Sequence, residues 1–265
     1  MQSYENNQNI TEITLKDSIP PSCFKDCHNL KTIVCVGNLN TIPPFAFRST
    51  GLRNVLLNSS ITSIDDYAFE NCQSLSSILL PSSIKTLGEG VFYGCKNLKH
   101  IYNIECVENI SSGAFCGCSS LLSIALNDNI TTLQAYTFAS CQQLRNVILP
   151  NKLRIILRHS FHFCENIREI NLPSTLHYID DAAFSSCACL QNVVIPEGVE
   201  YIGSYAFEDC LHLKRVVLPT TLRRMGKRVF WGCDELEEVV FQSHIDYKER
   251  APIFDHNSRV KIVLQ

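Results

Sequence analysis

The chain has 265 residues, 45% apolar and 18% charged, with a formal net charge of −3. This composition excludes a disordered chain, and the near-neutral charge argues against a nucleic-acid partner, which needs a basic face. No stretch approaches the roughly 18 consecutive apolar residues of a membrane span and no signal peptide is visible in the polar residues 1–18, so we expect no membrane insertion and a cytoplasmic location.

Residues 1–18 are expected to form an N-terminal cap. Ile13 and Leu15 alternate with polar neighbours, which is typical of a short strand with one buried face. A strand at this point would cover the exposed edge of the sheet that follows it.

Residues 19–241 contain one unit ten times. Each copy has a small residue, a Phe, two variable residues and a Cys, with Thr50 in the Cys place of the second copy. The Phe residues are spaced 23 apart, except for one step of 22. They are Phe24, Phe47, Phe69, Phe92, Phe115, Phe138, Phe161, Phe184, Phe207 and Phe230. A fixed period of this length indicates a stack of coils that bury one another's apolar faces.

Each unit predicts two extended pieces and a turn. In the third copy Ile78 and Leu80 alternate as a strand, and Pro81 ends it because proline has no amide hydrogen for a ladder. Ile84 and Leu87 suit a second extended piece, and the segment around Phe69 suits a tight helical or 3-10 turn. Neighbouring coils would pair as parallel sheets, giving a β-rich solenoid shaped as a horseshoe or rod.

Residues 242–265 are expected to form a C-terminal cap repeat. Phe254 falls 24 residues after Phe230, with Asn257 in the Cys place. Val260, Ile262 and Leu264 then alternate as a final strand. With both caps, the sequence predicts one structural domain.

The unit resembles the BspA-type leucine-rich repeat, with its pattern small-Phe-x-x-Cys-x-x-Leu-x-x-Ile-x-Leu-Pro. The resemblance covers about residues 19–241. It implies a leucine-rich-repeat solenoid that acts in binding or adhesion, as in bacterial surface proteins, and it implies no catalytic residues. We therefore expect a protein that is not an enzyme and that has no cofactor.

Fourteen cysteines leave three interpretations open: a disulfide framework, zinc sites and small buried core residues. Nine occupy the repeat position, where side chains of one column point in parallel, which is poor disulfide geometry. This favours buried core residues with free thiols. His159 and His162 lie near Cys164, but His162 follows a core Phe in a column of variable residues, so we expect it to face solvent and to bind no metal.

The residue between the two core positions of each first strand must point outward. That row is almost entirely apolar: Val34, Leu56, Leu79, Tyr102, Ala125, Ile148, Asn171, Val194, Val217 and Val240. The row two residues earlier is mostly polar and includes His100 and Arg215, and the row before that is often basic and includes Lys99, Arg145 and Arg168.

Two interpretations of the apolar row stand beside each other. It is a docking groove for another protein or peptide with acidic groups, or it reflects the preference of β-branched residues for one another across strands. The groove predicts contacts at His100, Tyr102, Ile148, Asn171, Val194, Arg215, Val217, Lys99, Arg145 and Arg168. The resulting hypothesis is a non-catalytic, protein-binding scaffold; the alternative is an adhesin or surface antigen exported by an unconventional route.

Overall fold

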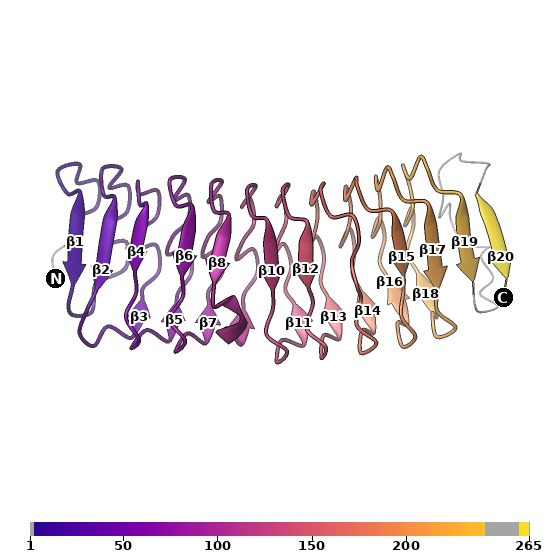
Figure 1. Cartoon of the computed structure of the whole chain (residues 1–265), viewed down its shortest axis with the longest axis horizontal. Helices are drawn as coiled ribbons and strands as arrows, with labels where there is room; N and C mark the ends of the chain where they lie inside the picture. The colour runs from indigo at the N-terminus through magenta and orange to yellow at the C-terminus, as the bar shows by residue number, and fades with distance from the viewer. Residues whose placement is uncertain (1–2, 242–259, 265) are drawn as a thin grey trace. The chain divides into compact units, whose positions relative to one another are not determined.

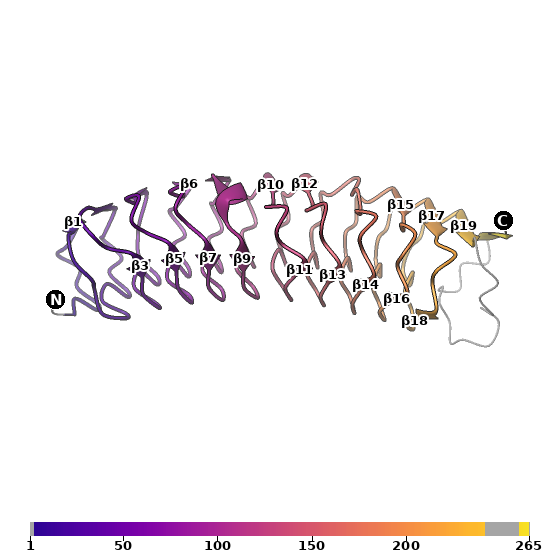
Figure 2. The same cartoon turned by 90° about the horizontal axis from the view of Figure 1, so that it is seen from below.

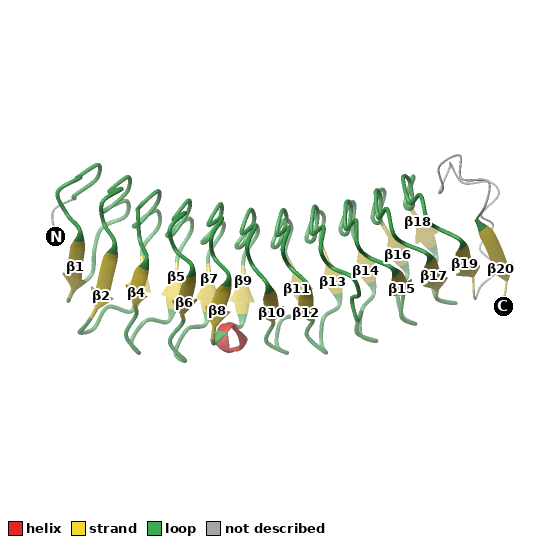
Figure 3. Ribbon diagram, turned by 45° about the horizontal axis from the view of Figure 1, so that its top comes forward, coloured by secondary structure: helices red, strands yellow, loops and turns green. Residues whose placement is uncertain are grey.

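The computed structural model describes residues 3–241 and 260–264 as parallel β-strands joined by tight turns (Figure 1). The chain divides into two compact units, residues 1–127 and residues 128–265. Among the described residues the only helix is the 3-10 helix η1 (Ile104–Cys106) in the first unit, red in Figure 3. The fold is therefore the β-rich, parallel-strand solenoid that the period predicts.

The first unit carries two rows of strands on different sides of its coils (Figures 1 and 2). The longer strands are β1 (Glu12–Leu15), β2 (Thr32–Cys35), β4 (Asn54–Leu56), β6 (Ser77–Leu79), β8 (His100–Tyr102) and β10 (Ser123–Ala125). The two-residue strands are β3 (Thr41–Ile42), β5 (Ser63–Ile64), β7 (Thr86–Leu87) and β9 (Asn109–Ile110). Parallel pairing joins β1-β2-β4, β6-β8 and β3-β5-β7-β9. The predicted N-terminal strand is confirmed, since Ile13 lies opposite Ile33.

The second unit repeats this arrangement. Its longer strands are β12 (Asn146–Ile148), β15 (Asn192–Val194), β17 (Arg215–Leu218), β19 (Glu238–Phe241) and β20 (Lys261–Leu264). Its two-residue strands are β11 (Thr132–Leu133), β13 (Ile155–Ile156), β14 (Tyr178–Ile179), β16 (Tyr201–Ile202) and β18 (Arg224–Met225). The predicted final strand is confirmed as β20, which pairs with β19. Phe254 and Asn257 of the expected cap lie outside the described residues.

One predicted strand is missing. The pattern places a strand at Ile170-x-Leu172, but residues 169–172 have no strand structure, although β12 and β15 form in the coils on either side. Asn171 is the one polar residue in a row that is otherwise apolar or aromatic, and asparagine is depleted in strands. Glu169 does not by itself explain the loss, because Glu238 occupies the same row in the formed strand β19. The local sequence therefore interrupts the row of longer strands.

A column of stacked Phe rings forms the core of each unit. In the first unit the rings of Phe24, Phe47 and Phe69 follow one another with centroids 5.4–5.5 Å apart, and in the second unit Phe184 lies 5.2 Å from each neighbouring ring. All ten repeat Phe side chains are buried. Tyr4 extends the first column, with its ring 5.5 Å from Phe24.

The turn around each core Phe is not the helical or 3-10 turn expected from the sequence. Tyr67 and Asn71, two residues before and two after Phe69, both have φ of 56°. A left-handed residue breaks the path of a right-handed helix, so the chain makes successive turns instead. All ten repeats have positive φ at these two positions. The Phe69 amide donates to the Val91 carbonyl of the next coil at 2.9 Å, so the turns themselves form a ladder.

The repeat cysteines are buried free thiols that also donate hydrogen bonds. The Cys187 thiol donates to the Phe161 carbonyl of the preceding coil at 3.2 Å, while the Cys164 amide donates to the same carbonyl at 3.1 Å. Equivalent thiol bonds of 3.1–3.3 Å recur along both units. Burial raises the pKa of Cys187 to about 12. Cysteine thus fits this column because it is small and still offers a donor to a buried carbonyl.

The burial of these cysteines determines how many thiols should react in the native protein. All fourteen cysteines are free, and only Cys106, Cys116 and Cys189 are partly exposed. Because the thiolate is the reactive species, the eleven buried thiols should not react in the native protein. Titration with a chromogenic disulfide reagent should find at most three thiols in buffer and all fourteen in denaturant. Fewer than fourteen in denaturant without reductant would show disulfides and contradict the free-thiol column.

Candidate functional site

The outward-pointing side chains of the longer strands form a surface that we call the strand face. In the first unit Leu56, Leu79 and Tyr102 are each more than half exposed, at 53–58%. The rings of His100 and Tyr102, both on β8, stack with centroids 6.0 Å apart, and Lys99 is exposed beside them. Val34 and Ala125 are only partly exposed. The first unit therefore presents three neighbouring, solvent-exposed apolar side chains with a cation nearby.

In the second unit the strand face is less uniform. Ile148 is 66% exposed and Val194 is 61% exposed, but Val217 is partly buried and Val240 is 1% exposed. The expectation that the whole row faces solvent is therefore wrong at Val240, which belongs to the core of β19. On the strand face of this unit, the exposed large apolar residues lie on β12 and β15, on either side of the missing strand.

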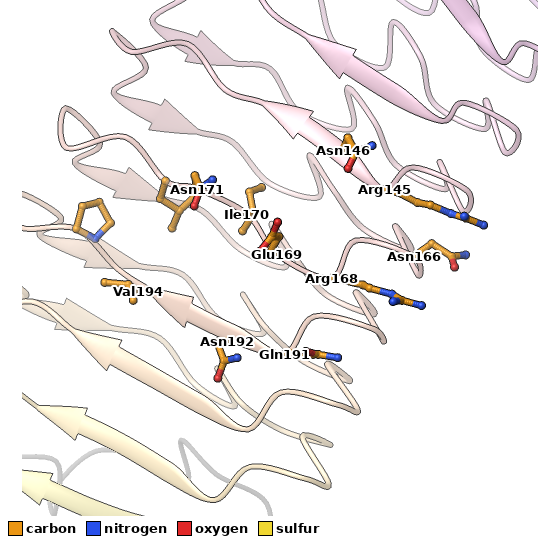
Figure 4. A pocket seen from close by; sticks show the side chains of 12 residues that line it. Arg145, Asn146, Asn166, Arg168, Glu169, Ile170, Asn171, Gln191, Asn192 and Val194 are labelled. Carbon is orange, nitrogen blue, oxygen red and sulfur yellow. The ribbon is translucent and has the colours of Figure 1, made fainter.

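A hollow of about 830 Å³ lies where that strand is missing. Its charged lining residues are Arg145, Arg168 and Glu169 (Figure 4). Its amide-bearing lining residues are Asn146, Asn166, Asn171, Gln191 and Asn192. Its apolar lining residues are Ile170, Leu172, Val194 and Pro196. This volume falls within the range of about 300–1,000 Å³ that is typical of ligand sites.

The hollow brings together four of the residues singled out from the sequence: Arg145, Arg168, Asn171 and Val194. Ile148 is exposed nearby on β12 but does not line it. Arg215 is in an ion pair with Glu238, at 2.6 Å, and Val217 lies on the same strand, β17. Lys99, His100 and Tyr102 belong to the first unit. Of the amides, the sequence reasoning singled out Asn171 and missed Asn146, Asn166, Gln191 and Asn192; the available signal was that Asn146 and Asn192 stand two 23-residue periods apart in the same row.

Two histidines form a second candidate cluster. The rings of His159 and His162 meet edge to face with centroids 5.1 Å apart, and each has a buried Nδ1 atom without a hydrogen-bond partner. His162 is half-buried and Ser185 of the same column is buried, so the expectation that this column faces solvent is wrong. Stacked turns cover it from both sides. Among the described residues, no group of three or more His, Cys, Asp or Glu side chains is placed to hold a metal ion.

Because of this histidine pair, we expect the folded protein to lose stability in acid. Burial lowers the pKa of both residues. At His159 the charge of Arg158 lowers the pKa further, and Asp180 and Asp181 partly oppose this shift. At His162 the neighbouring His159 lowers the pKa further. Below the ordinary histidine pKa of about 6.5, the unfolded chain therefore binds protons that the folded chain does not. Stability should be full above this pH and should fall as the pH decreases through it.

The measurement is the urea midpoint as a function of pH. Replacing both His159 and His162 with Gln should flatten the fall in acid, whereas replacing His177, an exposed histidine on another turn, should leave it unchanged. An identical pH dependence in the double variant and the natural protein would remove this explanation.

The sequence profile of the BspA type leucine rich repeat region matches residues 1–121 and 131–260, in six copies. None of the curated proteins matches the chain. Among the described residues, no helix has the length and apolar character needed to cross a membrane.

Solved structures share the fold. A leucine rich cell surface protein from Faecalibacterium prausnitzii aligns with a TM-score of 0.58 at 21% identity, over 94% of this chain and 70% of that one. A leucine-rich repeat protein from Eubacterium ventriosum gives 0.59 at 17% identity, over 89% and 75%. The pneumococcal vaccine antigen PcpA gives 0.58 at 17% identity, over 99% and 80%. At these identities the similarity establishes the fold alone.

Proposed function

The chain belongs to the BspA-type leucine-rich repeat family, and from this premise we propose that it is a non-catalytic scaffold that binds another protein through its strand face. The observation that carries the proposal is the exposure of large apolar side chains on that face. Leu56, Leu79 and Tyr102 in the first unit, and Ile148 and Val194 in the second, are each at least 53% exposed. Exposed apolar groups arranged in a row are typical of interaction surfaces.

Cross-strand packing alone does not account for this row. The preference of β-branched residues for neighbouring strands is a preference for side chains that bury one another. Leu56, Leu79 and Tyr102 are not β-branched, and neighbouring strands leave more than half of each exposed. A partner that covers them would supply the burial that the sheet does not.

Photo-crosslinking at single positions tests this proposal. A photoreactive phenylalanine analogue at Leu79 or Val194 should give specific crosslinked partners in cells that make the protein. The same analogue at Tyr93 or Leu211, exposed apolar residues in the turns rather than on the strands, should not. Each partner would then be tested with purified protein and the variants Tyr102→Glu and Val194→Glu. Equal crosslinking from all four positions would reject the strand face as the binding surface.

The location of the scaffold is a separate part of the proposal. Free thiols in every cysteine support a reducing compartment such as the cytoplasm. The alternative is an exported adhesin or surface antigen. It is supported by the cell surface protein and the vaccine antigen among the structures of the same fold. Labelling of intact cells with an antibody decides between the two: surface labelling supports the adhesin, and labelling only after permeabilisation supports the scaffold inside the cell.

A further inference from the structure

We propose that the hollow of the second unit binds an extended peptide segment with an acidic side chain, which Arg145 and Arg168 hold by their guanidinium groups. This inference rests on the proposed protein-binding function and names the class of partner.

The two arginines are cations without an anionic partner. Arg145 has one long contact, 3.5 Å, with the Gln143 side chain, and no carboxylate among the described residues lies within ion-pair distance of Arg145 or Arg168. They extend in the same direction from neighbouring coils (Figure 4). Two parallel guanidinium groups form a site that a carboxylate can bridge with charge-assisted hydrogen bonds.

Two other cations on this face of the second unit, Lys214 and Arg215, are in ion pairs. Arg215 donates to Glu238 at 2.6 Å, and Lys214 lies 3.8 Å from Glu235. The Glu235 carboxylate also accepts from His212. These two side chains are therefore less open to a ligand than Arg145 and Arg168, and they provide a matched control.

The backbone of the interrupted coil is also unpaired. Among the described residues, the only backbone hydrogen bond that residues 168–172 make is the one that the Arg168 carbonyl accepts from the Gln191 amide, at 3.1 Å. By contrast, residues 192–194 of β15 pair in register with residues 215–217 of β17. Residues 169–172 thus present amide and carbonyl groups that a partner in extended conformation can pair with, as in recognition by strand addition.

The remaining lining suits a peptide better than a glycan. The side chains of Asn146, Asn171, Gln191 and Asn192 make no hydrogen bonds within the described residues, and amides match the donors and acceptors of a peptide backbone. Val194 offers an apolar contact for a neighbouring side chain. None of the lining residues is aromatic, so the hollow has no ring on which a sugar or a base could stack.

The experiment selects short random peptides, displayed on phage, on the immobilised full-length protein. We expect the recovered peptides to be enriched in Asp and Glu. A fluorescent synthetic copy of one of them should bind the variant Arg145→Gln/Arg168→Gln about 10- to 100-fold more weakly, as expected for loss of hydrogen bonds to a charged group. The control variant Lys214→Gln/Arg215→Gln should bind it within about twofold, since exposed ion pairs contribute little. Circular dichroism checks that both variants are folded.

The outcomes separate this inference from the proposed function. Recovered peptides without acidic enrichment, or equal affinity for the Arg145→Gln/Arg168→Gln variant, would overturn the inference. So would displacement of the peptide by mannose-type oligosaccharides, which would identify a glycan as the occupant. In each case crosslinking from Leu79 and Val194 would leave the strand-face scaffold standing. No recovered peptide together with no strand-face crosslinking would overturn both.

Discussion

Replacement of Phe184 by alanine is expected to lower the free energy of unfolding by about 3–5 kcal/mol, the usual cost of removing a buried aromatic side chain. The Phe184 ring is fully buried and lies 5.2 Å from the ring on either side, at interplanar angles of 7° and 8°. Alanine leaves a cavity that is bordered by two coils. Because each coil of a solenoid contacts only its neighbours, the cavity weakens both of these interfaces.

Urea denaturation followed by circular dichroism measures the effect. Phe163→Ala is the matched control, because Phe163 is the same residue type one coil away and is 43% exposed. Its cost should stay within about 0.5 kcal/mol, as for most surface substitutions. Phe184→Leu, which fills more of the space, should fall between the two. A Phe184→Ala midpoint equal to that of Phe163→Ala would contradict a core built on stacked rings.

The position of this core could be predicted from the sequence because the period is nearly constant. Steps of 23 residues, with a single step of 22, place every repeat Phe in one column without any knowledge of the backbone. Tyr4 was missed because it precedes Phe24 by 20 residues, so the column continues where the period does not. The turns were predicted as helical because a sequence indicates a residue with positive φ only where that residue is glycine, as at Gly90 and Gly94. In the third repeat the same positions are Tyr67 and Asn71.

The candidate site could be predicted only in part. The alternation of a strand determines which side chains point outward, so the exposed positions of Leu79 and Val194 follow from the pattern. The hollow does not follow from it, because it depends on backbone hydrogen bonds that residues 169–172 do not make. Asn171 was visible as an interruption of the apolar row, but a single polar residue in a row does not reveal that its whole strand is absent.

Restoring the strand should therefore remove the site. In the double variant Glu169→Thr/Asn171→Val, the interrupted coil gains the residue types that other coils use, threonine and valine, which favour strands by up to about 1 kcal/mol on host-protein scales. We expect residues 169–172 to pair with their neighbours and the variant to be more stable by about that amount. The selected acidic peptide should bind at least about tenfold more weakly although both arginines remain, because the backbone groups that it pairs with are then occupied.

Hydrogen exchange detects the change directly. In the natural protein the amides of 169–172 should exchange much faster than those of Val193 and Val216, which lie in paired strands. In the double variant the two groups should become similar. Asn54→Val, an exposed Asn in the formed strand β4 of the first unit, is the control and should change neither the exchange of 169–172 nor peptide affinity. If the repaired coil exchanges slowly and still binds the peptide with unchanged affinity, the arginines act without the open backbone, and strand addition is not the mode of binding.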